Sequence, residues 1–251
     1  MIVVVDGGST DNTAGVVRRY IPLGVGWLPL GVNRGFGSSA NRGIAATSSE
    51  SVLVLNPDLV VEPGCVRDLG RAMQADVRLA IVGPTVGDLD GTPYPSARAF
   101  PHLIDAVGHG FIGLFWKENP WSKRYLVPNR VDWISGTAML LRRRPFESVG
   151  GFDESYFMYV EDVDLAWRLA EKGWTVALVA AATVRHAIGG SSESVPYRMI
   201  VAHHRSLWRF ATKTTQGVER LLLPVVAVGL FTRAGLVALR RLINGKPPAA
   251  R

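Results

Sequence analysis

The sequence predicts an α/β fold in which a mostly parallel sheet is flanked by helices and followed by a helical C-terminal segment. Short runs rich in Val and Leu recur along the chain and alternate with segments of helical character. Two of these runs end in polar turn residues: Asp6 follows the first run, and Asn56-Pro57-Asp58 follows the run 51–55. Ligands of open α/β sheets bind outside the carboxyl ends of the strands, so these two acids are the first candidates for a site.

Each element is expected from a local pattern. Buried strands are expected where apolar runs are bounded by turn residues, and helices where small or amphipathic segments follow capping residues. The expected strands cover residues 2–5, 24–32, 51–55, 79–83, 131–141 and 174–179. The expected helices cover residues 13–20, 36–47, 63–74 and 162–172. Residues 1–197 are expected to form one domain, and residues 198–251 a basic amphipathic helical tail.

The positive charge of the chain is concentrated in this tail. Residues 1–197 carry 18 Lys/Arg and 20 acids, a net −2, whereas residues 198–251 carry ten Lys/Arg and one acid, a net +9. The apolar run 221–231 has eleven residues, fewer than the ~20 that a spanning helix needs. Arginines accompany the apolar residues that follow, which favours a helix lying on an anionic membrane surface. The alternative is a helix that packs on the domain or on a second subunit of a homodimer.

The expected location is cytoplasmic, at the inner face of the plasma membrane. Met1 leads directly into the first apolar run, so no secretory signal is visible. Cys65 has no second cysteine to pair with, which fits a reducing compartment. Nucleic acid is not an expected partner, because the basic residues lie beside an apolar stripe rather than among exposed stacking aromatics.

Three segments carry residues that could do chemistry. Asp58, in the turn Asn56-Pro57-Asp58, could hold Mg²⁺ or Mn²⁺ against a diphosphate, although the tripeptide taken alone favours a plain turn. Glu161 and Asp162 begin a helix whose next acid, Asp164, has Arg168 as an i,i+4 partner. The first two are therefore available as a general base. His186, between a strand and a Gly/Ser segment, could be a metal ligand or a structural histidine.

A dinucleotide-binding pattern is also present. Residues 35–40 match G-x-G-x-x-A, and an acid follows about 20 residues later. However, Asn33 and Arg34 directly precede the glycines, and Pro29 interrupts the upstream strand. The glycines are therefore expected to permit close packing rather than to bind a nicotinamide cofactor.

Taken together, these segments resemble the family-2 inverting glycosyltransferases of the GT-A fold. The resemblance covers roughly residues 2–192, and the order and spacing of the motifs make it specific. The matching segments are residues 2–13, Asn33-Arg34-Gly35-Phe36-Gly37 with Asn41, Asn56-Pro57-Asp58, Trp133-Ile134-Ser135-Gly136, Gly151-Phe152-Asp153-Glu154, Glu161-Asp162-Val163-Asp164-Leu165 with Arg168, and His186 with Gly189 and Ser191.

The resemblance implies roles for individual residues. Asp162 would be the catalytic base, with Glu161 helping to orient the acceptor. Asp58 and His186 would bind the metal, Mg²⁺ or Mn²⁺. The donor would be contacted by Asp6, Asp11, Asn33, Arg34, Asn56 and Trp133. The chain looks most like the bacterial rhamnosyltransferases of cell-wall assembly, which implies dTDP-rhamnose as donor and a glycan or polyprenyl-diphosphate-linked sugar as acceptor.

The start of the chain departs from the family pattern. Members begin with an extra strand, a turn and a helix ahead of the segment that Val3–Asp6 matches. Without that N-terminal strand we expect an exposed sheet edge, an incomplete wall around the base of the donor, and reduced stability or activity. Two alternatives are a sugar-nucleotide nucleotidyltransferase, against which the Glu161-Asp162 motif argues, and a non-catalytic nucleotide-binding protein.

Overall fold

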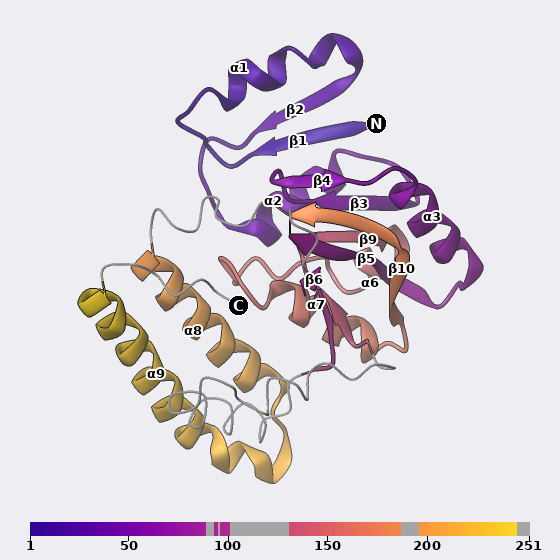
Figure 1. Ribbon diagram of the computed structural model, residues 1–251. Helices are drawn as coiled ribbons and strands as arrows, with labels where there is room; N and C mark the ends of the chain where they lie inside the picture. The colour runs from indigo at the N-terminus through magenta and orange to yellow at the C-terminus, as the bar shows by residue number, and fades with distance from the viewer. Residues whose placement is uncertain (89–92, 95, 101–130, 187–195, 245–251) are drawn as a thin grey trace.

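The computed structural model describes residues 1–88, 93–94, 96–100, 131–186 and 196–244 (Figure 1). The strands are β1 (Ile2–Asp6), β2 (Val25–Pro29), β3 (Ser51–Leu55), β4 (Leu59–Val61), β5 (Leu79–Asp88), β6 (Pro93–Tyr94), β7 (Ala97–Arg98), β8 (Trp133–Ile134), β9 (Ala138–Arg142) and β10 (Thr175–His186). The helices are α1 (Thr13–Arg18), α2 (Phe36–Ala45), α3 (Cys65–Ala75), α6 (Arg143–Ser148), α7 (Glu161–Ala170), α8 (Pro196–Thr214) and α9 (Leu223–Asn244), with 3₁₀ turns η1 (Ile21–Leu23) and η2 (Gly217–Leu222).

The central sheet is mixed, so the expectation of a mostly parallel sheet is wrong. Its strand order is β3-β9-β5-β10-β4, with β6 added beside β5. Only β5 and β10 pair in parallel, whereas β9 runs antiparallel to both of its neighbours and β4 antiparallel to β10. A buried apolar run predicts a strand but carries no information on its direction. Direction depends on which strands the chain places side by side, and that is a tertiary property.

The sheet is covered by helices on both faces. Alternate residues of β9 point to opposite sides, so Met139 and Leu141 pack with α2, α6 and α7, and Ala138 and Leu140 pack with α3. Cys65 contributes to the second cluster as a buried apolar residue, as the sequence indicated. The two clusters form a three-layer core that fixes the strand ends, and with them the candidate site.

Several predicted strands have different limits in the structure, and two of these differences concern the candidate site. The run 131–141 is divided by the turn at residues 135–137 into β8 and β9. The last strand, β10, continues past residue 179 as far as His186. Its pairing with β5 is irregular between Val179 and Thr183. Both differences matter for function, because the first creates a turn at the site and the second brings His186 to the edge of the sheet.

Strands β1 and β2 form a separate two-stranded parallel sheet, with α1 packed on it (Figure 1). Within the described residues β1 pairs with β2 alone, and β3 is the end strand of the central sheet. The two sheets are joined through α2, whose Gly43 comes into close contact with Val5 of β1.

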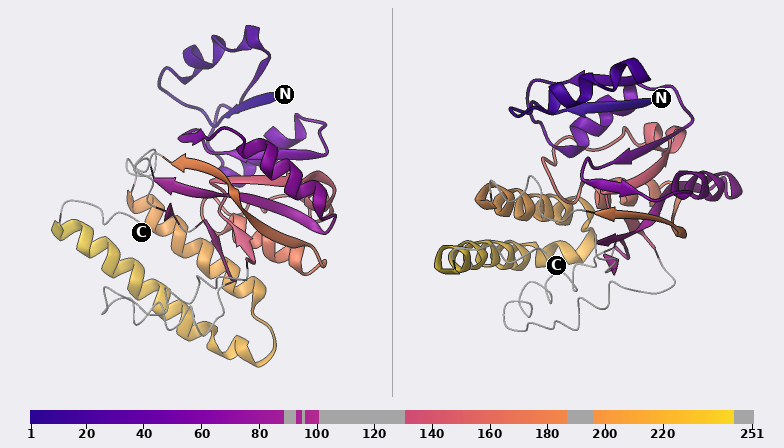
Figure 2. Two further views of the ribbon diagram at one scale, coloured as in Figure 1. Left: turned by 45° about the vertical axis from the view of Figure 1, so that its right-hand side comes forward. Right: turned by 45° about the horizontal axis from the view of Figure 1, so that its top comes forward.

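The C-terminal region is helical, as expected. Helices α8 and α9 lie side by side as a hairpin along one side of the domain (Figures 1 and 2). The apolar run 221–231 was judged too short to span a membrane, but it belongs to a longer helix, because α9 continues through Arg233 to Asn244. Among the described residues, Gly217–Ile243 is the one helical segment long and apolar enough to cross a membrane, by length and composition.

Candidate active site

The site is centred on the first turn of α7. The peptide N–H of Gly136 donates a 2.8 Å hydrogen bond to Oδ2 of Asp162, and the N–H of Val163 donates one of 2.8 Å to Oδ1. Gly136 lies in the turn between β8 and β9. A methyl group on Gly136 would stand 3.1 Å from the ring of Phe36. The turn, α2 and α7 thus meet around one carboxylate whose orientation is fixed by two backbone donors.

The turn at Asn56-Pro57-Asp58 is connected to the same point. The backbone N–H of Asn56 donates a 2.9 Å hydrogen bond to the carbonyl oxygen of Thr137, the residue after Gly136. Asp58 and Asp162 were predicted on opposite sides of the reaction, as donor-side ligand and acceptor-side base. The structure places their two segments against the same three-residue turn.

The residues before α7 have an unusual backbone. Tyr159 and Val160 have φ angles of 69° and 71°, and they are the only non-glycine residues with positive φ in the described part of the chain. Such a conformation is unfavourable for a β-branched residue and costs on the order of 1–3 kcal/mol. Packing compensates for it, because Val160 is buried with Tyr156 and Phe210. This strained pair sets the direction in which α7 begins, and therefore the placement of Glu161 and Asp162.

Both acids of the pair have raised pKa values. Burial, helped by the charge of Asp162, raises the pKa of Glu161 to about 8. Burial also raises the pKa of Asp162, although the hydrogen bonds from Gly136 and Val163 oppose the shift. Glu161 is only 6% exposed, and its Oε2 has no hydrogen-bond partner among the described residues. Asp162 is the more exposed of the two. Near neutral pH the raised pKa of Glu161 therefore favours its protonated form, whereas the two backbone N–H donors favour the ionised form of Asp162.

Replacing Glu161 by Gln should make the protein more stable at high pH. In the wild type, the raised pKa means that protonated Glu161 contributes favourably to the free energy of unfolding below about pH 4.5. This contribution is lost as the pH rises towards the folded-state pKa of about 8. The amide does not ionise, so the variant should gain up to about 1.4 kcal/mol relative to wild type for each pH unit in this window. Urea unfolding at pH 5 and pH 8.5 measures this difference. A difference that does not grow with pH would contradict burial as its cause.

A buried ionic network anchors α7 to α8. Asp164 is completely buried and accepts hydrogen bonds from Arg168 Nε at 2.7 Å, Lys213 Nζ at 2.6 Å and the Tyr156 hydroxyl at 3.2 Å. The pairing with Arg168 was predicted and is confirmed. Lys213 was missed, and it also contacts Asp153 at 3.1 Å. Because Lys213 lies 49 residues from Asp164, no local spacing rule could have found it.

The predicted donor-side residues of the first half gather at the carboxyl ends of β1 and β2. Asp6 accepts backbone hydrogen bonds from Gly8 and Ser9, which lower its pKa. Gly7 lies against Asn33, whose side-chain oxygen accepts a hydrogen bond from Gly35 N. The structure thus brings Asp6 and Asn33 together.

The other two predicted donor-side residues, Arg34 and Asp11, lie at the surface. Arg34 is exposed. Asp11 is exposed and accepts a 2.5 Å hydrogen bond from the Thr13 hydroxyl, and it supports the start of α1 in the way a capping residue does.

Trp133 is held from two sides. Its indole N–H donates a 3.1 Å hydrogen bond to the carbonyl oxygen of Ala99, and the Arg98 guanidinium lies 5.9 Å from the ring centroid. The positive charge of Arg98 also acts to lower the pKa of Asp162. Arg98 was not predicted as a site residue. A donor contact by Trp133 stays a prediction, and it would have to use the ring rather than the N–H.

The backbone segments of the predicted metal ligands Asp58 and His186 meet at one end of the central sheet. The backbone of His186 pairs with Leu59, the residue after Asp58, and on the other side with Asp88 at the end of β5. Oδ1 of Asp88 is buried and has no hydrogen-bond partner in the described structure. No three metal-ligating side chains cluster among those described, a set that excludes the side chain of His186. Gly189 and Ser191 also lie outside the described residues. Two carboxylates and an imidazole suit a divalent cation.

A comparison with known proteins decides the family. The sequence profile of Glycosyl transferase family 2 matches residues 1–150, more than half of the chain. The chain belongs to glycosyl transferase family 2. As a family member it is an enzyme that transfers a hexose, which removes the nucleotidyltransferase alternative.

Two relatives are rhamnosyltransferases. N-acetylglucosaminyl-diphospho-decaprenol L-rhamnosyltransferase of Mycobacterium tuberculosis (strain H37Rv) is 38% identical over 257 residues, which cover 95% of this chain and 81% of the relative. Rhamnosyltransferase WbbL of Escherichia coli K12 is 27% identical over 217 residues, which cover 81% of this chain and 80% of the relative. The similarity to the mycobacterial enzyme extends across the Glu161-Asp162 segment and into the helical tail.

Solved structures support the GT-A fold. The mannosyltransferase PcManGT from Pyrobaculum calidifontis, in complex with GDP-Man and Mn²⁺, superposes with a TM-score of 0.58 at 16% identity, over 99% of this chain and 67% of that one. GalNAc-T7 with UDP, GalNAc and Mn²⁺ gives the same TM-score and identity over 99% of this chain and 52% of that one. At this identity the likeness concerns the fold alone.

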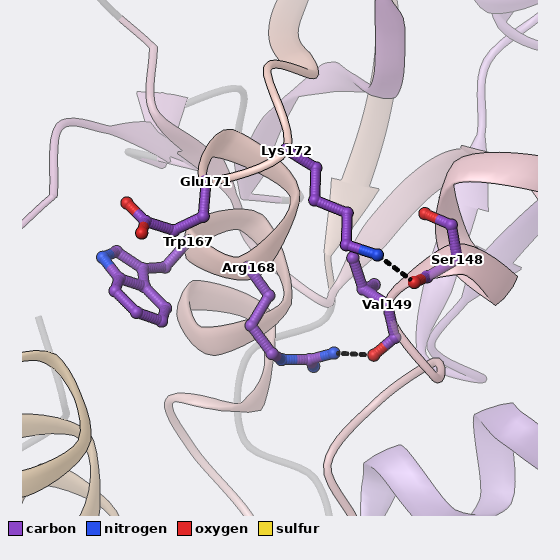
Figure 3. Close-up of a pocket in the computed structure, with 6 residues that line it drawn as sticks. All are labelled: Ser148, Val149, Trp167, Arg168, Glu171 and Lys172. Atoms are coloured by element: carbon purple, nitrogen blue, oxygen red, sulfur yellow. Dashed lines mark hydrogen bonds between the residues drawn. The ribbon is translucent and has the colours of Figure 1, made fainter.

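One surface groove of this glycosyltransferase lies away from the acid pair. It is lined by Ser148, Val149, Trp167, Arg168, Glu171 and Lys172, between the ends of α6 and α7 (Figure 3). Arg168 donates to the carbonyl oxygen of Val149 at 2.7 Å, and Lys172 donates to that of Ser148 at 2.5 Å. These bonds connect the C-terminal end of α7 to the end of α6, so the groove lies where the two helices are fastened together.

Proposed function

We propose that this enzyme transfers L-rhamnose from dTDP-rhamnose, with inversion, onto a polyprenyl-diphosphate-linked sugar during cell-envelope synthesis. The observation that carries the proposal is the carboxylate of Asp162, which two backbone N–H groups orient beside the turn that also holds the Asn56-Pro57-Asp58 segment. The 38% identity to the mycobacterial enzyme over nearly the whole chain supports the choice of sugar and acceptor.

On the acceptor side, Asp162 accepts the proton of the attacking hydroxyl. Its raised pKa makes it a stronger base than an ordinary aspartate. Glu161, buried beside it and favouring the protonated form at neutral pH, keeps the pair from carrying two full negative charges. Attack from the face opposite the nucleotide in one displacement inverts the anomeric carbon.

On the donor side, Asp6 and Asn33 lie where a nucleoside would enter, at the carboxyl ends of β1 and β2. Asp58, Asp88 and His186 would hold a divalent cation at the nearby edge of the central sheet. When bound, Mg²⁺ or Mn²⁺ would neutralise the negative charge of the departing nucleoside diphosphate.

A donor panel tests the proposed function. The purified protein is incubated with dTDP-rhamnose, UDP-galactose, UDP-glucose or GDP-mannose, with vesicles that contain polyprenyl-diphosphate-GlcNAc, and with Mg²⁺ or Mn²⁺. We expect transfer from dTDP-rhamnose and a product with the inverted anomeric configuration by NMR. Transfer from another donor in its place would overturn the sugar assignment, and metal-independent transfer would overturn the metal assignment.

Replacing Asp88 by Asn should weaken metal binding by about tenfold or more, the effect typical of perturbing groups at a metal site. Titration of the apo protein with Mn²⁺, followed by the electron paramagnetic resonance signal of free Mn²⁺, measures this without requiring activity. The matched control is Asp76→Asn, at the other end of β5, where the carboxylate accepts a hydrogen bond from Arg78 N. Equal Mn²⁺ affinity of the two variants would remove Asp88 from the site.

We also propose that the α8–α9 hairpin rests on the anionic inner surface of the plasma membrane. Large apolar side chains stand out from α9 and its preceding turn, with Phe231 84%, Leu221 79% and Ile243 72% exposed. The net charge of +9 in residues 198–251 complements acidic lipids. Phe231→Glu, at an exposed position, should reduce flotation with phosphatidylglycerol vesicles while leaving the folded protein intact. Undiminished flotation would contradict the docking surface.

A further inference from the structure

The segment that starts α7 has little local support for its conformation. Val160 is the N-cap of α7, yet its side chain makes no capping hydrogen bond, and its φ of 71° is left-handed. Helices usually begin at Ser, Thr, Asp or Asn, whose side chains cap the first turn. Tyr159 also has a positive φ, which residues with a Cβ avoid. The direction in which Glu161 and Asp162 point is therefore fixed by contacts from outside this segment.

One face of α8 supplies two of these contacts. Ser206 and Phe210 are four residues apart, so they lie on the same side of the helix, and both are buried. The Ser206 hydroxyl donates a 3.0 Å hydrogen bond to the carbonyl oxygen of Met158, just before the strained pair. Phe210 packs in the same buried cluster as Val160 and Val163. Side chains from the helical tail thus hold the strained backbone.

Lys213 adds an ionic contact from the same face, three residues beyond Phe210. Its ammonium nitrogen lies 2.6 Å from Oδ1 of Asp164, in the first turn of α7, and 3.1 Å from Oδ2 of Asp153. Asp153 precedes the strained pair and Asp164 follows it, so one ammonium group bridges the two ends of the segment. Because Asp164 is completely buried, losing this partner is unfavourable, and the carboxylate holds α7 firmly against α8.

Two carboxylates of α7 face opposite ways. Each residue of an α-helix is rotated by about 100° from the one before it, so Asp162 and Asp164 point roughly 200° apart around the axis. Asp164 is held by Lys213 of α8, whereas Asp162 accepts the 2.8 Å hydrogen bond from Gly136 N. Contacts on two sides of α7 therefore fix its rotation about its own axis. Without the contact to α8 the helix is free to turn, and Asp162 moves away from Gly136.

We propose that Ser206, Phe210 and Lys213 of α8 are positioning residues for the catalytic base. The proposal rests on the proposed function, in which Asp162 is that base, and it adds that the helical tail takes part in transfer. The tail therefore does more than dock on a membrane. Transfer to an acceptor that needs no membrane still depends on these three side chains.

The first test compares Ser206→Ala with Thr212→Ala, its matched control on α8. Each variant deletes one hydroxyl that donates to a backbone carbonyl, that of Met158 for Ser206 and that of Arg209 for Thr212. The acceptor is farnesyl-diphosphate-GlcNAc without vesicles, so membrane docking does not enter the rate. We expect kcat to fall about fivefold or more in Ser206→Ala, because small displacements of a reacting group cost large factors in rate. Thr212→Ala should keep the wild-type kcat, and the Kd for the donor should be unchanged in both variants.

Hydrogen exchange gives a readout that does not depend on activity. The N–H of Gly136 donates to Asp162, so its exchange with solvent reports how well the carboxylate is held. By NMR, this amide should exchange about fivefold faster in Ser206→Ala than in Thr212→Ala, the same local loosening that lowers kcat. Amides of β9, inside the central sheet, report global stability, and their exchange should change less.

Lys213 provides a rescue test. Lys213→Met deletes the ammonium group but keeps the length of the side chain, and its kcat should fall about tenfold or more with the donor Kd unchanged. Lys213→Arg keeps the positive charge and should retain most of the wild-type kcat. If Lys213→Met does not fold, the comparison of Ser206→Ala with Thr212→Ala decides by itself.

Equal kcat and equal exchange of the Gly136 N–H in Ser206→Ala and Thr212→Ala would overturn the proposal. A lower Tm with unchanged kcat would also overturn it, because α8 would then be a structural support alone. The proposed function fails separately, if the wild type transfers no rhamnose. In that case the exchange of the Gly136 N–H still tests whether α8 positions Asp162.

Discussion

Replacing Asp162 by Asn should reduce rhamnose transfer by about 10²-fold to 10⁴-fold, the range that a positioned general base contributes. The amide keeps the shape of the side chain, and its oxygen can still accept the hydrogen bond from Gly136 N that holds the carboxylate in place. The variant loses the ability to accept a proton and, with it, the second backbone hydrogen bond, from Val163 N. Donor affinity, measured by calorimetry with dTDP-rhamnose and Mn²⁺, should therefore remain close to wild type.

The control for this variant is Asp76→Asn, which makes the same chemical change at a carboxylate that also accepts a backbone hydrogen bond but lies at the end of α3. Its turnover should equal that of wild type. Near-normal turnover of Asp162→Asn would place the base elsewhere, with Glu161 as the next candidate. A parallel loss of donor affinity would move Asp162 to the donor side of the site.

Replacing Gly35 by Ala should have the largest structural effect of any small substitution in the site. The added methyl group would stand 2.0 Å from the carbonyl oxygen of Phe157, which also accepts a hydrogen bond from Phe36 N. In addition, Gly35 has φ and ψ of 100° and 169°, a region that other residues avoid at a cost of about 1–3 kcal/mol. The loop before α7 would have to move away from α2, which would displace the acid pair and lower both Tm and turnover.

Gly24→Ala is the matched control, because Gly24 also has a positive φ, 87°, but nothing lies within 4 Å of the added methyl group. This variant should lose only the free energy of unfolding that the positive φ costs, about 1 kcal/mol by urea unfolding. Its turnover should be retained. If Gly35→Ala were as stable and as active as Gly24→Ala, the contact between α2 and the 156–160 loop would have no role in positioning the acids.

The end of β5 shows where prediction from the sequence failed. The strand was predicted to cover residues 79–83 and so to stop at Gly83. In the structure the strand continues for five more residues, and Pro84 pairs opposite Val179, where β10 becomes irregular. A proline cannot donate to a neighbouring strand and is tolerated at such an irregularity. Asp88 was therefore missed, although it follows a buried strand just as the predicted acids do.

The tail shows a different kind of failure. Its composition predicted a basic amphipathic helix, and helices are present there. The composition did not indicate which of the arginines and lysines of the tail are buried. The structure instead pairs Lys213 with the buried Asp164 and leaves Arg233 only partly exposed. Which basic residues are buried depends on how the hairpin folds back on the domain.

The sequence by itself determined the α/β class, most of the helices, the acids at the strand ends, and the pairing of Asp164 with Arg168. All of these follow from periodicities of a few residues, which decide what shares a face or a turn. Only the tertiary structure decided the direction of the strands, the contact between Gly136 and Asp162 across 26 residues, and that between Lys213 and Asp164 across 49. Such contacts depend on the path by which the chain returns to a point in space, and packing of the whole core selects that path.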